Sequence, residues 1–177
     1  AFDREVPLLP VFVWFYILAF PFWAVGYLLA ARRGKDMFYR FVATDLTIHF
    51  ICFICFILIP TTNIRPEIAG NTISEKLLAL VYSLDGGRSP SNLFPSIHCY
   101  VSWMCWKGVE GSEKVPKWYQ RFSLVFAILI IISTQVLKQH YIVDAAAALL
   151  LVEFFWRFYQ KGQRHKWVVH IFAHKKK

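Results

Sequence analysis

Long apolar runs without charged residues, separated by short polar segments, make up most of this chain. Residues 11–31 carry no charge, and a helix of that length, at 1.5 Å per residue, covers a hydrocarbon core of ~30 Å. Similar runs occupy residues 46–60 and 122–137, and a fourth run, residues 140–159, is broken only by Asp144, Glu153 and Arg157. A shorter run, residues 95–106, begins with a proline, which is typical of a first helical position. The pattern predicts an all-α integral membrane bundle of five transmembrane helices.

Two further segments have amphipathic patterns. In the long polar loop, residues 61–94, Thr72 and Glu75 have the spacing of a capping box, and an apolar stripe follows them. We expect a short helix there that lies on or dips into the membrane interface. The basic tail, residues 161–177, mixes lysines with aromatic residues and is expected to be an interfacial segment. The stripe in the loop consists of Ile73, Leu77, Leu80, Val81 and Leu84.

Composition supports a membrane protein and excludes other classes. Of the 177 residues, 57% are hydrophobic and 18% are charged, which excludes a disordered chain and disfavours an ordinary soluble domain. The net charge is +9, but the cations lie mostly between the apolar runs, so anionic lipid headgroups are the expected partner and nucleic acid is not. Cys52 and Cys55 form a CxxC pair with no second pair nearby, which favours helix packing over metal binding or redox chemistry.

The distribution of Lys and Arg predicts the orientation in the membrane. The loop at residues 32–40, the loop at 107–121 and the tail at 157–177 hold 15 of the 20 basic residues. Such loops face the cytoplasm as a rule. The tail is therefore expected on the cytoplasmic side and the 61–94 loop on the extracytoplasmic side. We expect a single catalytic domain over residues 1–177, and the sequence makes no prediction about its oligomeric state.

Ionisable and polar residues at membrane depth are costly and are functional candidates by default. Asp144 follows His140 by four residues, which places both side chains on one face of a helix. His98 lies one turn into the short helix that starts at residue 95. In the predicted topology these residues gather at the outer end of the bundle with four others, Arg65, Arg88, Ser96 and Lys138.

Two histidines, a carboxylate and three cations at one membrane boundary are suited to a phosphate group. A neutral His140 can attack phosphorus if Asp144 holds its other ring nitrogen and stabilises the developing positive charge. Protonated His98 can donate to the departing alkoxide. The cations, Ser96 and backbone N–H groups would bind the phosphate oxygens, so this chemistry needs no metal or other cofactor. The cations are Arg65, Lys138 and Arg88.

Other interpretations of the same residues remain open. His98, His140 and Asp144 could bind zinc, although the nearby cations argue against it. Arg65 and Lys138 could be interfacial anchors. Asp45 and His49 are also four residues apart, and a buried interhelical hydrogen bond is favoured for them over a proton relay. The tail histidines, His165, His170 and His174, are expected to be solvated.

Three motifs in this order resemble a known family. Pro95-Ser96-Ile97-His98 resembles the central PSxH motif of the type 2 phosphatidic acid phosphatase superfamily. The segment from Ser133 to Asp144 resembles its third motif, in which a Ser-Arg pair is followed by five residues, His, three residues and Asp. Arg65-Pro66 resembles the end of the first motif. The resemblance implies a helical membrane enzyme in which His140 is the nucleophile, Asp144 orients it and His98 is the general acid.

The chain also departs from the motifs. Leu58 stands where the first motif has a Lys, and Thr134 stands where the third has an Arg, so Lys138 and Arg88 are expected to replace the missing cations. The strings around His98 and His140 resemble the branch with bacterial lipid phosphatases and inositol phosphorylceramide synthase-type transferases. Family members usually have six spans, and we expect this chain to lack the one that would precede residue 11.

These observations lead to one main functional prediction and two alternatives. The main prediction is a membrane lipid phosphatase that acts on a lipid phosphate or pyrophosphate at the extracytoplasmic face through a phosphohistidine. A headgroup phosphotransferase with an alcohol acceptor is the second, because a smaller set of cations suits a phosphodiester, which carries one negative charge where a monoester carries about two. The third is a lipid-binding or transport protein without catalysis.

Overall fold

The computed structural model describes residues 2–173 and is built from helices. No strand occurs in that part of the chain, so the all-α prediction is confirmed. Thr62 and Ser91 form one isolated bridge within the long loop. The elements in chain order are α1 (Phe2–Glu5), the 3-10 helix η1 (Pro10–Phe12), α2 (Val13–Ala31), α3 (Lys35–Leu58), α4 (Ile73–Leu84), α5 (Ile97–Val109), α6 (Lys117–Val136), α7 (Ile142–Gln160) and α8 (Lys166–Ala173).

The apolar runs mark the helices, but charged residues extend them. Helix α3 begins at Lys35, well before the predicted start at Leu46, because an ion pair between Asp36 and Arg40 (2.7 Å) supports its first turn. The connection from α2 is short, and Gly34 allows it by adopting a φ of 114°. Much of the predicted loop at residues 32–40 is therefore helical.

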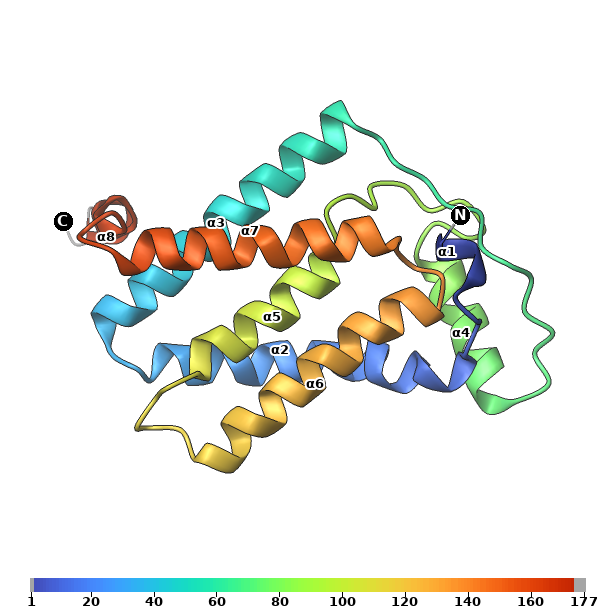
Figure 1. Ribbon diagram of the computed structural model, residues 1–177, viewed down its shortest axis with the longest axis horizontal. Coiled ribbons are helices and arrows are strands. Elements are labelled where there is room, and N and C mark those ends of the chain that lie inside the picture. Colours follow the sequence, from blue (N-terminus) through green and yellow to red (C-terminus); the bar gives the residue numbers. More distant parts are fainter. Residues whose placement is uncertain (1, 174–177) are drawn as a thin grey trace.

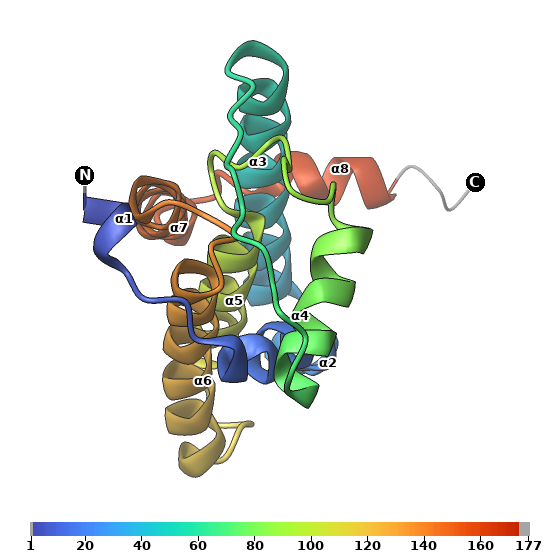
Figure 2. The same cartoon turned by 90° about the vertical axis from the view of Figure 1, so that its right-hand side faces the viewer.

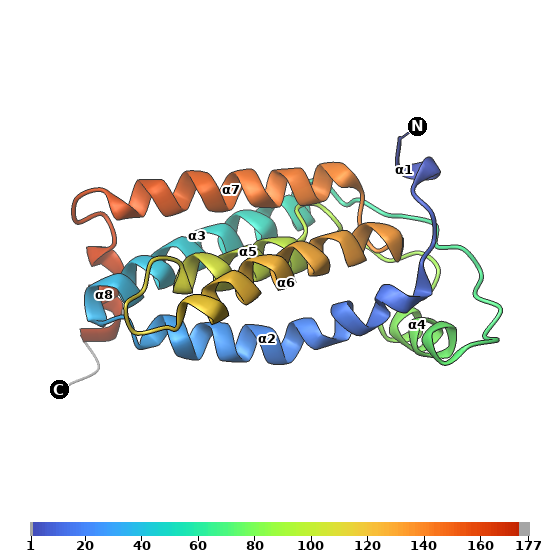
Figure 3. The same ribbon diagram turned by 60° about the horizontal axis from the view of Figure 1, so that its bottom comes forward.

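Helix α5 is the centre of the bundle. It packs against α2, α3, α6 and α7, and Figure 3 shows these helices arranged around it. Contact with α2 is close at Gly26, where a Cβ atom would lie only 2.6 Å from the sulfur of Cys105. A small residue at a helix crossing lets two backbones approach, which is a common device in membrane bundles. The central position of α5 places His98, in its first turn, inside the bundle.

Within residues 2–173, three helices are long and apolar enough to cross a membrane: Pro10–Ala31, Lys35–Leu58 and Lys117–Val136. Their outer faces carry exposed large apolar residues, for example Phe53 and Leu58 on α3, and Figure 1 shows α3 diverging from α7 toward its C-terminal end. Helix α5 has 13 residues, about 20 Å at 1.5 Å per residue, which is shorter than the ~30 Å hydrocarbon core. The predicted crossings by α5 and α7 therefore stay predictions.

The helix predicted in the long loop is present as α4, with the predicted capping box. Thr72 accepts from the backbone N–H of Glu75 (3.2 Å), and the Glu75 carboxylate accepts from the N–H of Thr72 (3.1 Å). The apolar stripe is divided between two faces, and its members Leu77 and Val81 pack against the core together with Leu78 and Tyr82. Ile73, Leu80 and Leu84 are exposed, because α4 turns Leu78 and Tyr82 toward α2 and η1 instead. Helix α4 is thus apolar on two sides, one of which is free to meet lipid.

The tail forms a helix that runs across the bundle. Figure 2 shows α8 lying crosswise to α7. Val168 is buried against α3 and α7, whereas Trp167, Ile171 and Phe172 are exposed, which is typical of an interfacial helix. The prediction of a solvated His165 is wrong, because it is buried and its Nε2 lies 2.9 Å from Asp36. His174, and with it the end of the tail, lies outside the described residues.

Candidate active site

The N-terminus of α5 positions His98. Ser96 is the N-cap residue, and its buried hydroxyl accepts from the backbone N–H of Cys99 at 3.3 Å. Pro95 therefore precedes the cap and is not the first helical residue. The His98 ring stacks on Tyr16 with centroids 4.4 Å apart, and Trp23 also packs against it, 5.2 Å away. The aromatic side chains of α2 thus fix the orientation of His98.

A tight turn between α6 and α7 positions His140. Lys138 has a positive φ of 53°, and the backbone N–H groups of Gln139 and His140 both donate to the carbonyl of Thr134 (2.9 and 3.1 Å). Helix α7 begins only at Ile142. The prediction that His140 opens the last helix is wrong, because this turn replaces the helical conformation before Ile142.

The carbonyl of Leu93 determines the state of the His140 ring. It lies 3.0 Å from Nδ1 of His140, and since a carbonyl can only accept, Nδ1 must carry the proton. In the neutral ring Nε2 then keeps its lone pair. His140 is thus held in the tautomer that a nucleophile attacking through Nε2 requires.

Asp144 acts on the His140 ring through its charge and not through a hydrogen bond. Its carboxylate accepts from the backbone N–H of Tyr141 at 2.8 Å, and the same Oδ2 lies 3.5 Å from Nδ1 of His140. We expected Asp144 to be hydrogen-bonded to His140. The hydrogen bond goes to Leu93 instead, and the contact with Asp144 becomes an ion pair when the His140 ring gains a positive charge. Asp144 is buried, so its charge acts on the ring with little screening by solvent.

The rings of the two histidines lie close together, one from the first turn of α5 and the other from the turn between α6 and α7. Their ring centroids are 6.1 Å apart, with planes inclined by 52°. Rings this close can both reach one phosphate ester bound at their edges, with hydrogen bonds of ~3 Å. Nε2 of His98 is buried and has no hydrogen-bond partner within residues 2–173. A buried polar atom of this kind is costly unless a ligand or water meets it.

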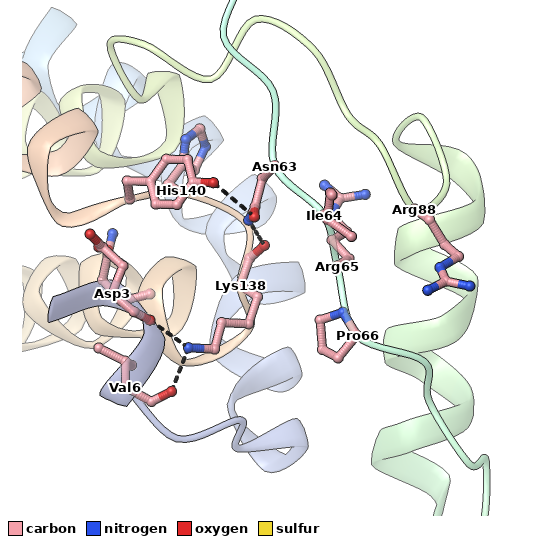
Figure 4. Close-up of a pocket in the computed structure, with 11 residues that line it drawn as sticks. Asp3, Val6, Asn63, Ile64, Arg65, Pro66, Arg88, Lys138 and His140 are labelled. Carbon is pink, nitrogen blue, oxygen red and sulfur yellow. Dashed lines mark hydrogen bonds between the residues drawn. The ribbon is translucent and has the colours of Figure 1, made fainter. Parts of the chain in front are cut away.

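A cavity of about 500 Å³ opens beside His140. It contains three of the predicted phosphate ligands, Arg65, Arg88 and Lys138. Figure 4 shows Lys138 turned toward the backbone of Asp3 and Val6, and Arg88 on the far side of the strand-like segment that carries Arg65 and Pro66. The three cations therefore line the same cavity, but not all of their side chains point toward His140.

Arg65 is the most buried of these cations. Its guanidinium is completely enclosed and binds the carboxylate of Asp85 (2.6 Å), the carbonyls of Asp85 and Gly87 (2.7 and 2.9 Å) and the side chain of Gln139. It also lies over the ring of Tyr82, 4.7 Å from the centroid. Only its Nε has no partner in the described part of the chain. Arg65 therefore holds the 61–94 loop together. Its side chain also lines the cavity, where Asp85 already balances part of its positive charge.

Tyr82 holds the same region from the other side. Its hydroxyl donates to the carbonyl of Leu137 at 2.7 Å, and burial raises its pKa to about 12. It thus remains a neutral donor. The contact ties α4 to the turn that carries His140, so the loop and the turn form one unit.

The remaining predicted phosphate ligands have other partners. The Lys138 ammonium donates to the carbonyl of Asp3 (2.8 Å) and to that of Val6. Arg88 is exposed and paired with Glu67 at 2.5 Å. The Ser96 hydroxyl is the α5 cap described above. Each group is near the histidine pair in the fold, but the contacts observed are structural.

A second cavity reaches His98 from the opposite direction. It has a volume of about 270 Å³ and lies between α2 and α4, where Tyr16, Phe20, Val81 and Leu84 make it apolar. Asp85 lines this cavity, whereas its partner Arg65 lines the one beside His140. The Arg65–Asp85 ion pair thus lies between a polar cavity and an apolar one.

Sequence reasoning did not identify four residues at this site. Leu93 acts through its carbonyl, and Tyr16 acts by stacking, so neither is recognisable from residue type. Asp85 and Gln139 could have been noticed as polar residues near the motifs, but their contacts with Arg65 depend on how the long loop folds back. Among residues 2–173, no group of three or more His, Cys, Asp or Glu side chains is placed to hold a metal ion.

The other Asp–His pair bonds neighbouring helices, as predicted. Asp45 accepts from the hydroxyl of Tyr27 on α2 (2.6 Å), and His49 contacts the hydroxyl of Tyr100 on α5. His49 lies 3.7 Å from Asp45. These contacts tie α3 to two other helices below the candidate site.

Comparison with protein families decides the membership of the chain. The profile of the PAP2 superfamily matches residues 1–157. The chain belongs to the PAP2 superfamily. Comparison with the curated proteins finds no match to this chain, and comparison with the solved structures finds none either. Membership in the PAP2 superfamily indicates phosphatase or phosphotransferase-type activity, and the three apolar helices indicate an integral membrane protein.

Proposed function

We propose that this PAP2 superfamily member is a membrane lipid phosphatase that removes phosphate from a lipid phosphate or pyrophosphate through a phosphohistidine at His140. The observation that carries the proposal is the histidine pair. The ring centroids of the two imidazoles are 6.1 Å apart, and the ring of His140 is held with Nε2 free.

In the first step, Nε2 of His140 attacks phosphorus. A nitrogen–phosphorus bond forms while the bond from phosphorus to the lipid oxygen breaks, and His98 gives its proton to that oxygen. The His140 ring becomes positively charged during this step. The buried carboxylate of Asp144, 3.5 Å from Nδ1, stabilises that charge.

In the second step, His98 acts as a base. It takes a proton from water, the oxygen attacks phosphorus, and the nitrogen–phosphorus bond breaks to release phosphate. Both histidines return to their starting protonation states. The stacking of His98 on Tyr16 keeps its ring in place for both proton transfers.

The two cavities support a lipid as the substrate. The cavity beside His140 has cations around it and suits the phosphate. The cavity beside His98 is apolar and suits the carbon chain next to the leaving oxygen. His98 is thus on the side where a lipid alcohol would leave, which is the place for a general acid.

The contacts of the cations favour one second candidate, a headgroup phosphotransferase with an alcohol acceptor. Arg65 shares its charge with Asp85, and Arg88 shares its charge with Glu67. The phosphate site therefore offers less positive charge than three cations would supply. A diester has one negative charge and a monoester about two, so this site suits a diester, from which a headgroup would pass to an alcohol in place of water.

We further propose that the site faces the extracytoplasmic side. The support is the distribution of basic residues, because 15 of the 20 lie in the 32–40 and 107–121 segments and in the tail, at the other end of the bundle. Accessibility of single cysteines introduced in the 61–94 loop and in the 107–121 segment, probed in intact cells with a membrane-impermeant reagent, tests the orientation.

The function is tested with the full chain in lipid nanodiscs. Phosphate release is measured from phosphatidic acid and from a prenyl pyrophosphate, and headgroup transfer is measured from a phosphodiester lipid with and without an alcohol acceptor. Release without acceptor supports the phosphatase. Product only with acceptor supports the transferase. Binding of these lipids without turnover of any would contradict both and favour a non-catalytic lipid-binding protein.

A further inference from the structure

The bundle has a basic cavity at the end away from the histidines. It has a volume of about 400 Å³ and lies along the last turns of α7 and the turn that follows. Figure 1 shows this end of α7, next to α8, far from the end that adjoins α1 and α4. Its cationic residues are Arg157, Lys161 and Arg164.

The three cations keep most of their charge, because their contacts within the protein are few and long. The last carbonyls of α7 would ordinarily attract them, but Arg40 already donates to the carbonyls of Tyr159 and Gln160, both at 2.7 Å. Arg164 folds back, donates to the carbonyl of Phe158 at 3.4 Å and places its guanidinium 4.2 Å from the Phe158 ring centroid. These contacts hold the group in place without neutralising it. The cations are thus positioned and still charged.

One carboxylate lines the cavity, and it is largely committed elsewhere. Glu153 accepts from the indole of Trp103 (2.9 Å) and lies 3.0 Å from the ammonium of Lys107. Its distance to Arg157 is longer, 3.4 Å, and Arg157 is mostly exposed. The cavity therefore has a net positive charge.

The floor of the cavity is apolar. Leu150, Phe154 and Phe158 line it and remain exposed along α7. The adjacent helix α8 lies crosswise to the bundle with exposed Trp167, which is typical of the level of lipid headgroups (Figure 2). The cations are thus near headgroup level and the apolar floor extends toward the membrane interior.

We propose that this cavity is a binding site for the headgroup of an anionic phospholipid of the bilayer. The lipid phosphate contacts Arg157, Lys161 and Arg164, and an acyl chain lies along Leu150 and Phe154. The ligand is a membrane lipid and not free phosphate, because the cavity pairs cations with an exposed apolar floor. The site is separate from the histidine pair and does not depend on the proposed reaction.

The test is native mass spectrometry of the full chain in detergent, titrated with phosphatidylglycerol or with phosphatidylcholine of the same acyl chains. One variant combines Arg157→Gln, Lys161→Gln and Arg164→Gln. The control combines Lys114→Gln, Lys117→Gln and Arg121→Gln, which removes the same charge from exposed positions at the α5–α6 connection. The readout is lipid binding, so the result does not depend on catalytic activity.

We expect the protein to bind phosphatidylglycerol in preference to phosphatidylcholine, and the cavity variant to lose most of that preference. Each cation near a membrane surface contributes on the order of fivefold in affinity, so the combined loss should approach 100-fold, whereas the control should keep the preference. Equal loss in both variants would show charge attraction without a site and would overturn the proposal. Equal binding of the two lipids, or displacement of the lipid by millimolar inorganic phosphate, would overturn it as well.

Discussion

The two ends of the bundle differ in the surroundings of their buried polar groups. At the α5–α6 and α7–α8 end, Lys107 binds two carboxylates, Glu110 (3.2 Å) and Glu153 (3.0 Å), and Arg40 binds successive carbonyls of α7. At the histidine end, Nε2 of His98 and Nε of Arg65 have no partner among residues 2–173. Buried polar atoms are nearly always paired in folded proteins. Two such atoms also occur at the first end, Oγ of Ser123 and Nδ1 of His165. Those of His98 and Arg65 differ in that their side chains line the two cavities beside the histidine pair.

The comparison also separates two kinds of Asp–His pair. Asp45 and His49 have the same spacing as His140 and Asp144, in reverse order. The first pair lies within α3 and contacts tyrosines of two other helices. The second pair spans a turn and the start of α7, next to a cavity. The two pairs have the same spacing in the sequence, so only their surroundings in the fold distinguish them.

The largest expected effect is that of His140→Ala. Loss of a nucleophile should lower kcat/KM by at least about 10³-fold and abolish the acid-labile phosphoenzyme trapped by rapid quenching with radiolabelled lipid phosphate. The matched control is His49→Gln, which removes the histidine of the other pair and should leave the phosphoenzyme in place. A phosphoenzyme that persists in His140→Ala would contradict the assignment of the nucleophile.

His98→Ala should have an effect that depends on the leaving group. General acid catalysis contributes roughly 10² to 10⁴-fold, so loss of His98 should reduce turnover of an alkyl phosphate by about that much. A nitrophenyl phosphate ester should be affected far less, because its leaving group needs little protonation. Rates measured on both esters give the ratio. An equal loss of turnover on the alkyl and nitrophenyl esters would contradict the role of His98 as general acid.

Asp144→Asn should have a smaller effect than either histidine. Asparagine can still accept from the N–H of Tyr141, and the Leu93 carbonyl still holds the His140 ring, so only the charge 3.5 Å from Nδ1 is lost. We expect a decrease in kcat of roughly 10²-fold with little change in KM. A decrease as large as that of His140→Ala would mean that Asp144, and not Leu93, determines the tautomer of His140.

The smallest effects on activity are expected for two lysines at opposite ends of the bundle. Lys107→Gln removes contacts to two carboxylates and should lower the free energy of unfolding by about 2 kcal/mol, whereas Lys138→Gln removes contacts to two neutral carbonyls and should lower it by about 1 kcal/mol. Both should keep kcat/KM within about threefold. Thermal unfolding in detergent and steady-state kinetics measure the two quantities. A tenfold loss of kcat/KM in Lys138→Gln but not in Lys107→Gln would show that Lys138 binds the substrate phosphate.

Local patterns in the sequence predicted the presence of the main helices, though not where α3 and α7 begin, and pointed to the histidine pair. Residues 11–31 predict α2 because an uncharged run of that length has no stable alternative in a bilayer, and Thr72 with Glu75 predicts the start of α4 because a capping box is a local contact. The motif around Ser96 and His98, followed by the spacing from His140 to Asp144, suggested one site for the same reason. Each of these signals involves residues within a few turns of one another.

Only the tertiary structure decided what each charge at the site is bound to. Arg65 meets Asp85 and Gln139, Lys138 meets the backbone of Asp3 and Val6, and His140 meets the carbonyl of Leu93. A carbonyl is present at every residue, and a cation can pair with any carboxylate within reach, so residue type does not select the partner. The folding of the 61–94 loop over the N-terminus of α5 selects it, because that packing determines which polar groups are buried together and must satisfy one another.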